Sequence, residues 1–176
     1  MFTKGTSTIK YSLKGGVDGY SAERDKLFDA YDLFSDPETE EIDYIVGGPG
    51  MSNEADSLAK AQKLIDVANI RKDCIAFISP PKYSVIGVPN TNTIVENTIE
   101  FFDQLSSTSY AVFDNNYKYM YDKYNDKYRY LPCNADVAGL TLSTALNSEP
   151  WFSPAGFNRG QLLLSLIHIS EPTRQH

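Results

Sequence analysis

The chain has 176 residues, of which 41% are hydrophobic and 22% are charged, and these values are typical of globular domains and not of disordered segments. The 16 lysines and arginines against 23 acidic residues give a net charge of −7, which disfavours nucleic acid and anionic membrane surfaces as partners. No apolar run suits a secretory signal or a membrane span. Cys74 and Cys133 are too few for a disulfide framework, so we expect both to be small buried side chains.

Residues 1–41 form the first predicted unit, an N-terminal segment that ends in an acidic connector. Gly15 and Gly16 indicate a turn, and residues 36–41 carry four carboxylates. The pairs Asp36/Glu38 and Glu40/Glu41 offer ligands to a hard cation, but exposed carboxylate runs are usually solvated. We therefore expect a solvated connector and no metal site.

Residues 42–150 form the second predicted unit, an α/β core. The β-prone residues 42–46 are stopped by Gly47, Gly48, Pro49 and Gly50, called here the glycine turn. A helix is predicted after the turn, with Asn53 as its N-cap and Asp56 three residues further on. Its apolar residues recur at helical spacing, at Leu58, Ala61, Leu64, Ile65 and Ala68.

The strand and helix pattern then repeats. Residues 74–78 predict a buried strand, and Thr93 with Glu96 predicts a capping box that opens a second helix. Residues 110–113 predict a third strand. Three strands separated by helices favour right-handed crossovers and a parallel sheet, so the expected fold is three-layer α/β with helices on both faces. In the second helix we expect four side chains to face inward, namely Val95, Ile99, Phe102 and Leu105.

Seven of the twelve tyrosines fall between Tyr110 and Tyr130. Polar and aromatic residues alternate there about Asn125 and Asp126, which predicts a tyrosine-rich β-hairpin. Two interpretations stay open: the tyrosines pack on the core and on one another, or they form a protein interface. Stacking on nucleic acid is disfavoured because nearby aspartates offset the basic residues.

After the hairpin, Asn134 is predicted to cap a helix that carries Val137, Leu140 and Leu146 and stops before Pro150. Residues 151–163 read as an aromatic loop rich in Pro and Gly. Residues 164–176 do not continue this design, since they match a translated sequencing adapter. We expect the native sequence to stop between residues 161 and 163.

The positions of the histidines limit which catalytic sites are possible, because His168 and His176 both lie in the adapter-like tail. Residues 1–163 then contain no imidazole, which excludes Ser-His-Asp and Cys-His sites, and two distant cysteines cannot hold zinc. The glycine turn is the remaining small-molecule candidate, since backbone N–H groups there could cradle a phosphate. It lacks a nucleotide-binding motif, and Pro49 removes one donor, so a tight strand-to-helix turn is favoured. We expect no catalytic residues, no cofactor and no metal.

Five segments of the chain together carry a resemblance to a known family. The segments are Gly-Gly-Val-Asp-Gly at 15–19, Ala-Tyr-Asp-Leu-Phe-Ser-Asp-Pro-Glu at 30–38, Ile-Val-Gly-Gly at 45–48, Asp-Cys-Ile-Ala-Phe-Ile-Ser-Pro-Pro at 73–81 and Pro-Trp-Phe-Ser-Pro-Ala-Gly-Phe-Asn-Arg-Gly at 150–160. The most specific is the last, a Trp-x-Ser-Pro-Ala-Gly-x-x-Arg-Gly loop after a helix. These segments resemble the tail sheath proteins of contractile, T-even-like bacteriophages.

This resemblance implies that residues 42–150 form the non-catalytic, subtilisin-like sheath domain, followed in the family by a C-terminal domain that this chain lacks. Met1 could then be an internal methionine. The implied function is a structural subunit that polymerises around the tail tube and contracts to deliver the genome through the host envelope. Implied partners are other sheath subunits, the tube protein, the baseplate and the tail terminator, in a virion assembled in the host cytoplasm. The alternatives are a nucleotide-binding domain that uses the glycine turn, or a generic tyrosine-rich interaction module.

Overall fold

The computed structural model describes residues 12, 14–16, 23–156 and 160. The adapter-like tail with His168 and His176, the start at Met1 and most of residues 157–163 lie outside the described residues. No helix in the described part is long and apolar enough to cross a membrane. The helices are α1 (Arg24–Asp32), α2 (Glu54–Arg71), α3 (Lys82–Val85), α4 (Thr91–Asp103) and α5 (Asn134–Asn147), and the strands are β1 (Tyr44–Val46), β2 (Ile75–Ile78), β3 (Ala111–Phe113), β4 (Tyr117–Asp122) and β5 (Lys127–Pro132).

A three-stranded parallel sheet lies at the centre of the molecule, in the order β1-β2-β3. Ile45 is paired with Ala76, and Phe77 with Val112. The middle strand β2 is the most buried, since three of its four residues are inaccessible to solvent. The parallel sheet predicted from the sequence is confirmed.

Helix α2 supplies half of the buried members of the core cluster. The Asn53 side chain accepts a hydrogen bond of 2.7 Å from the Asp56 N–H, which confirms the predicted N-cap. Lys72 ends the helix in the left-handed region, at φ 62°. The core cluster joins α2, β2 and α4, and its buried members are Ala61, Leu64, Ile65, Ala68, Cys74, Ala76, Ile78 and Phe101. Cys133 is also buried, so both cysteines lie where the sequence placed them.

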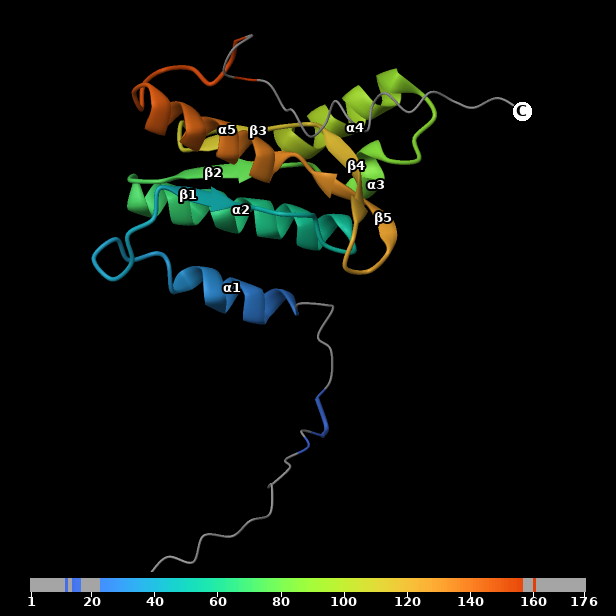
Figure 1. Cartoon of the computed structure of the whole chain (residues 1–176), viewed down its shortest axis with the longest axis horizontal. Helices are drawn as coiled ribbons and strands as arrows, with labels where there is room; N and C mark the ends of the chain where they lie inside the picture. The colour runs from blue at the N-terminus through green and yellow to red at the C-terminus, as the bar shows by residue number, and fades with distance from the viewer. Residues whose placement is uncertain (1–11, 13, 17–22, 157–159, 161–176) are drawn as a thin grey trace, which may run out of the picture.

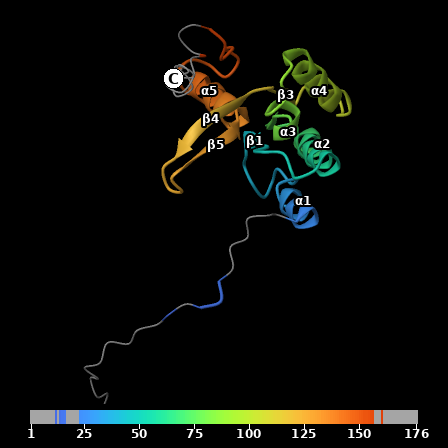
Figure 2. The ribbon, with the colours of Figure 1, turned by 90° about the vertical axis from the view of Figure 1, so that its right-hand side faces the viewer.

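Helices lie on both sides of this small sheet. Phe101 of α4 belongs to the same core cluster as the α2 side chains, whereas α5 contacts β1 and β2 from the other side. Figure 2 shows α5 on one side of the sheet and α2 and α4 on the other. The chain is therefore a mixed α/β domain with a small parallel sheet.

The predicted start of α4 was wrong, and its predicted inner face was right for Phe102 and Leu105, which pack against the core cluster, but wrong for the other two residues. The helix begins at Thr91 and its N-cap is Asn90, whose side chain accepts from the Asn92 N–H at 2.9 Å, so Thr93 does not open it. Val95 and Ile99 were expected inside but are 48% and 53% exposed. The helix is rotated because Phe101 and Thr98 occupy the buried side, which leaves Val95 and Ile99 facing outward.

The prediction for the start of α5 was also wrong. Cys133 occupies the N-cap position, and Asn134 is the first helical residue, almost fully buried. Asn134 does not cap because its side chain points into the molecule and donates to the Gly48 carbonyl at 2.9 Å. Leu146, near the end of the helix, is 77% exposed.

The N-terminal unit contains a helix, α1, that the sequence did not predict. Ion pairs hold it against α2, between Arg24 and Asp56 at 3.1 Å and between Lys63 and Asp32. The acidic connector after it is solvated, as predicted, but its backbone is fixed. The buried Arg71 guanidinium donates to the carbonyls of Phe34, Asp36 and Glu40 at 2.8–3.1 Å.

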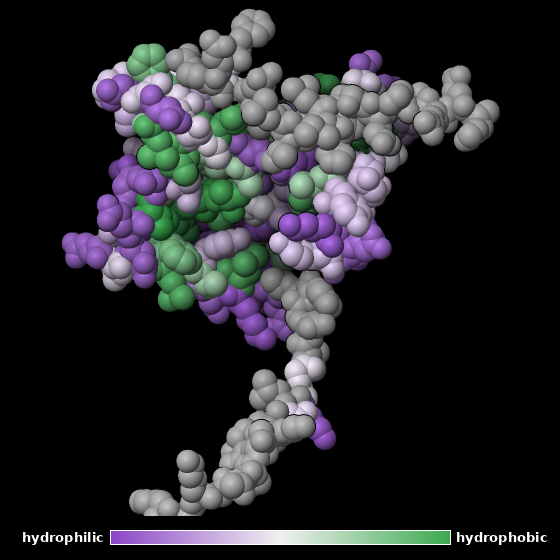
Figure 3. Space-filling model, in the orientation of Figure 1, coloured by the Kyte–Doolittle hydropathy of each residue, from purple (hydrophilic) through white to green (hydrophobic). Residues whose placement is uncertain are grey.

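Strands β4 and β5 form the predicted antiparallel hairpin, in which Tyr119 faces Tyr130 and Tyr121 faces Tyr128. The connecting turn spans residues 123–126, and Asp126 takes φ 50°, a conformation that Asp tolerates. Figure 2 shows the hairpin standing away from the parallel sheet, on the side opposite α4. The apolar residues visible in Figure 3 gather over α5 and β1, where Leu142 and Val46 are both 44% exposed.

Candidate functional site

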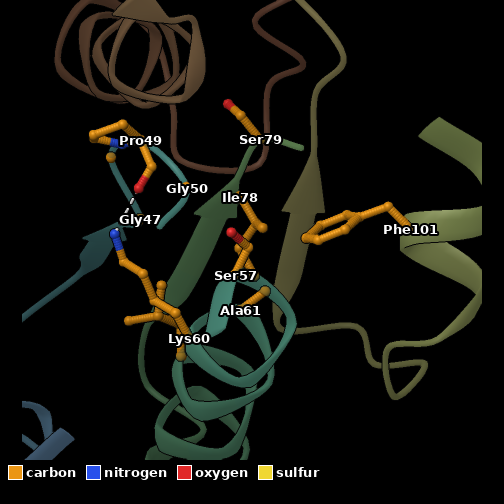
Figure 4. A pocket seen from close by; sticks show the side chains of 11 residues that line it. Gly47, Pro49, Gly50, Ser57, Lys60, Ala61, Ile78, Ser79 and Phe101 are labelled. Atoms are coloured by element: carbon orange, nitrogen blue, oxygen red, sulfur yellow. Dashed lines mark hydrogen bonds between the residues drawn. The ribbon is translucent and has the colours of Figure 1, made fainter. Parts of the chain in front are cut away.

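The glycine turn connects β1 to α2 and lies beside the end of β2 (Figure 4). The Gly47 N–H of the turn donates to the Phe77 carbonyl at 2.9 Å, and the N–H of Met51, the residue after the turn, donates to Ser57 Oγ at 2.9 Å. A Cβ on Gly50 would lie 2.8 Å from Pro81 Cβ. Glycine is needed here because two backbone segments pack closely.

The space beneath the turn is too small for a phosphate. The cavity that the turn lines measures about 10 Å³, at the lower limit for one water molecule. Lys60, the only cation lining it, donates to the Pro49 carbonyl at 2.8 Å, as the dashed line in Figure 4 shows. Burial lowers the pKa of Lys60. These contacts favour a tight structural turn over a nucleotide site.

Asn134 ties the glycine turn to α5, a contact that joins positions 86 residues apart in the chain. Only the donor half of its amide is used, since Asn134 Oδ1 accepts no hydrogen bond from the described residues. Periodicity could not have identified this role, because a polar residue at the start of a helix is normally assigned to capping.

Polar groups also meet at the carboxyl ends of β2 and β3, the edge where open α/β sheets bind ligands. Ser79 Oγ donates to Asp114 at 2.7 Å, and the Tyr117 hydroxyl donates to the Pro80 carbonyl at 2.6 Å. Burial raises the pKa of Asp114, and it raises the pKa of Tyr117 to about 12. These bonds fix the base of the hairpin to the sheet.

The acidic residues of the connector do not gather. Asp36 Oδ1 accepts from the Glu38 N–H at 3.0 Å, which is a local turn contact. Across residues 23–156, no three His, Cys, Asp or Glu side chains are placed to hold one metal ion.

The tyrosines of the hairpin line one of its faces, called here the tyrosine face, which consists of Tyr119, Tyr121, Tyr128 and Tyr130. The ring centroid of Tyr119 lies 5.1 Å from that of Tyr128 and 4.5 Å from that of Tyr130. Each of the four tyrosines remains 39–52% exposed. The rings therefore pack on one another, as the first interpretation expects, and still present a broad surface to solvent, as the second requires.

The aromatic loop that follows α5 is described only through residue 156 and at Gly160. Trp151 is 78% exposed, and the Phe152 N–H donates to the Glu149 carbonyl at 3.0 Å. The rest of the loop lies outside the described residues.

Comparison with protein-family models gives no match. Among curated proteins, the chain is similar to the tail sheath protein of Vibrio phage KVP40, with 39% identity over 172 residues that cover 89% of this chain and 25% of the relative. The tail sheath protein of Enterobacteria phage T4 is 36% identical over 159 residues, covering 85% of this chain and 24% of the relative. The tail sheath protein of Salmonella phage ViI is 31% identical over 150 residues, covering 85% of this chain and 22% of the relative. The chain thus spans about a quarter of the length of the curated relatives it matches.

Proposed function

We propose that this chain, which is related to the tail sheath proteins of T4-like phages, is part of a structural subunit of a contractile tail sheath. The observation that carries the proposal is similarity along 85–89% of the chain to three proteins of that name. Such similarity is not confined to one motif, so it supports a common fold and a common role.

The proposed domain arrangement follows from the same relationship. Residues 42–150 are the subtilisin-like sheath domain, a three-layer α/β unit, and residues 1–41 are the N-terminal segment with its connector. Residues 151–163 lead toward a further domain, and residues 164–176 are adapter-derived. The exposed apolar residues over α5 and β1 support a neighbouring domain, because large apolar patches usually mark contacts.

The proposed mechanism is mechanical and not enzymatic. Subunits repack from an extended to a contracted arrangement, and the free-energy difference between the two drives the tail tube through the host envelope. The bonded Gly47 N–H, the small cavity beneath the glycine turn and the absence of histidine from residues 1–163 support a role without nucleotide hydrolysis.

The proposed partners are other sheath subunits, and beyond them the tube protein, the baseplate and the tail terminator. The proposed location is the virion tail, after assembly in the host cytoplasm. The net charge of −7 supports protein partners over nucleic acid or membrane.

Electron microscopy of the complete gene product tests this function. The gene that encodes this chain together with its continuation is expressed with and without the adjacent tube protein. Striated hollow tubes are the expected result, and only monodisperse subunits in both preparations would contradict it. A thermal-shift screen of the chain with nucleotides is expected to show no stabilisation, whereas a ligand at 100 times its Kd would add about 2.7 kcal/mol.

A further inference from the structure

The face of the hairpin opposite the tyrosines combines apolar and basic side chains. Strand alternation places Met120, Lys127, Arg129 and Leu131 on this side, next to Lys123 in the turn. All of them except Lys127 line a hollow of about 370 Å³. We call these five residues the basic hairpin face.

This face is locally positive within an acidic chain. Residues 117–132 carry four cations and two carboxylates, although the whole chain has a net charge of −7. Arg129 is paired with Asp122 at 2.8 Å. Within the described part of the chain, Lys123 and Lys127 have no carboxylate partner.

The outer side of α4 has the opposite character. Its sequence, TNTIVENTIEFFD, contains no lysine or arginine. Val95 and Ile99 form an exposed apolar ridge, and Glu96, Glu100 and Asp103 flank it along the helix. Ile99 and the three carboxylates also line a hollow of about 560 Å³. We call these five residues the acidic helix face.

The two faces cannot meet within one copy of the chain. Figure 2 shows the hairpin on one side of the parallel sheet and α4 on the other. The two faces are complementary in shape and charge. The acidic helix face has an apolar ridge flanked by carboxylates, and the basic hairpin face has an apolar hollow flanked by ammonium groups.

We propose that the basic hairpin face of one copy of this chain docks onto the acidic helix face of the next copy. The contact joins two different surfaces, so a pair of copies still has one unoccupied basic hairpin face and one unoccupied acidic helix face. Repetition therefore extends the assembly as an open series or a ring. This inference rests on the proposed function, because it assigns one contact through which sheath subunits associate.

The second copy is favoured as the occupant because both halves of a complementary pair are carried by the same chain. Lys123 and Lys127 contribute long-range attraction, and Val95 and Ile99 contribute the apolar area that excludes water. Salt is expected to weaken the contact, since the Debye length falls from about 10 Å at 0.1 M to about 3 Å at 1 M ionic strength.

Charge exchange tests the contact by sedimentation velocity of the full chain. Variant H carries Lys123→Glu and Lys127→Glu, and variant A carries Glu96→Lys and Glu100→Lys. The wild type is expected to associate as its concentration rises. H and A alone are expected to associate at least about tenfold more weakly, because like charges then face each other. An equimolar mixture of H and A restores opposite charges at every contact and is expected to associate like the wild type.

Controls carry the same charge changes elsewhere, with Lys14→Glu and Lys26→Glu for H, and Glu38→Lys and Glu40→Lys for A. These are expected to associate like the wild type. If A alone still associates, hairpin meets hairpin, and if H alone still associates, helix meets helix; either result overturns the proposal. A wild type that stays monomeric, or a mixture that stays monomeric, also overturns it. Striated tubes formed by the complete gene product would still support the proposed function in each case.

Discussion

The parallel-sheet core and the tyrosine hairpin both contain large apolar or aromatic side chains but bury them to different extents. Leu64, Ile65 and Phe77 of the core are at most 2% exposed, whereas the four residues of the tyrosine face are 39–52% exposed. The core side chains contact several elements at once, while the hairpin tyrosines contact mainly one another. Burial against many neighbours stabilises a fold, and a half-exposed aromatic face remains available for contacts with other molecules.

The largest expected effect is in the core. Phe77→Ala removes a fully buried ring from the central strand and is expected to lower the free energy of unfolding by about 3–5 kcal/mol. Urea denaturation measures it. Tyr124→Ala, at a residue that is 87% exposed, serves as the control and is expected to change stability by no more than about 0.5 kcal/mol. Equal losses in the two variants would remove the distinction between core and hairpin.

The next effect concerns the contact between the glycine turn and α5. Asn134→Ala leaves the Gly48 carbonyl without its donor and is expected to cost about 1–3 kcal/mol in urea denaturation. The exposed Asn115→Ala is the matched control and should have little effect. Wild-type stability for Asn134→Ala would mean that α5 is positioned by other contacts.

A smaller effect is expected on the tyrosine face. Tyr119→Ala removes two ring contacts and should lower the free energy of unfolding by at most about 1 kcal/mol, since cross-strand aromatic pairs contribute in that range. Tyr119→Phe keeps the rings and should be close to neutral. A loss for Tyr119→Ala as large as that for Phe77→Ala would show that the hairpin belongs to the folding core.

The last effect appears only in alkaline solution. Burial raises the pKa of Tyr117 to about 12, above the value near 10 of an exposed tyrosine. Between these pH values the unfolded chain loses this proton before the folded one does, so stability falls as pH rises. Tyr117→Phe removes this contribution, and its stability should fall less steeply over that interval. Parallel pH profiles in urea denaturation would contradict the burial of this hydroxyl.

The sequence was informative wherever apolar or aromatic residues recur at a regular spacing. The three parallel strands, α2 with its Asn53 cap and the hairpin follow from such patterns. Helix α1 was missed because none of its residues is buried and ion pairs to α2 hold it. The rotation of α4 depends on how Phe101 fits the sheet, which no helical period specifies.

The candidate surfaces were predictable only in part. The tyrosine cluster was evident from composition, but the basic hairpin face emerged only from strand register, and the acidic helix face only from the outward rotation of Val95 and Ile99. The roles of Asn134 and Arg71 depend on contacts between distant parts of the chain. Such contacts have no local signature in the sequence.

Complementation of a phage lacking its own sheath gene tests the central claim most directly. Residues 23–156 replace the matching segment of the Enterobacteria phage T4 tail sheath protein, and the matching segment of the Vibrio phage KVP40 relative serves as the control graft. The account predicts that the chimera assembles sheaths that contract when triggered, as seen by electron microscopy. A chimera that is folded and soluble but never assembles, beside a control graft that does, would contradict the assignment to the tail sheath.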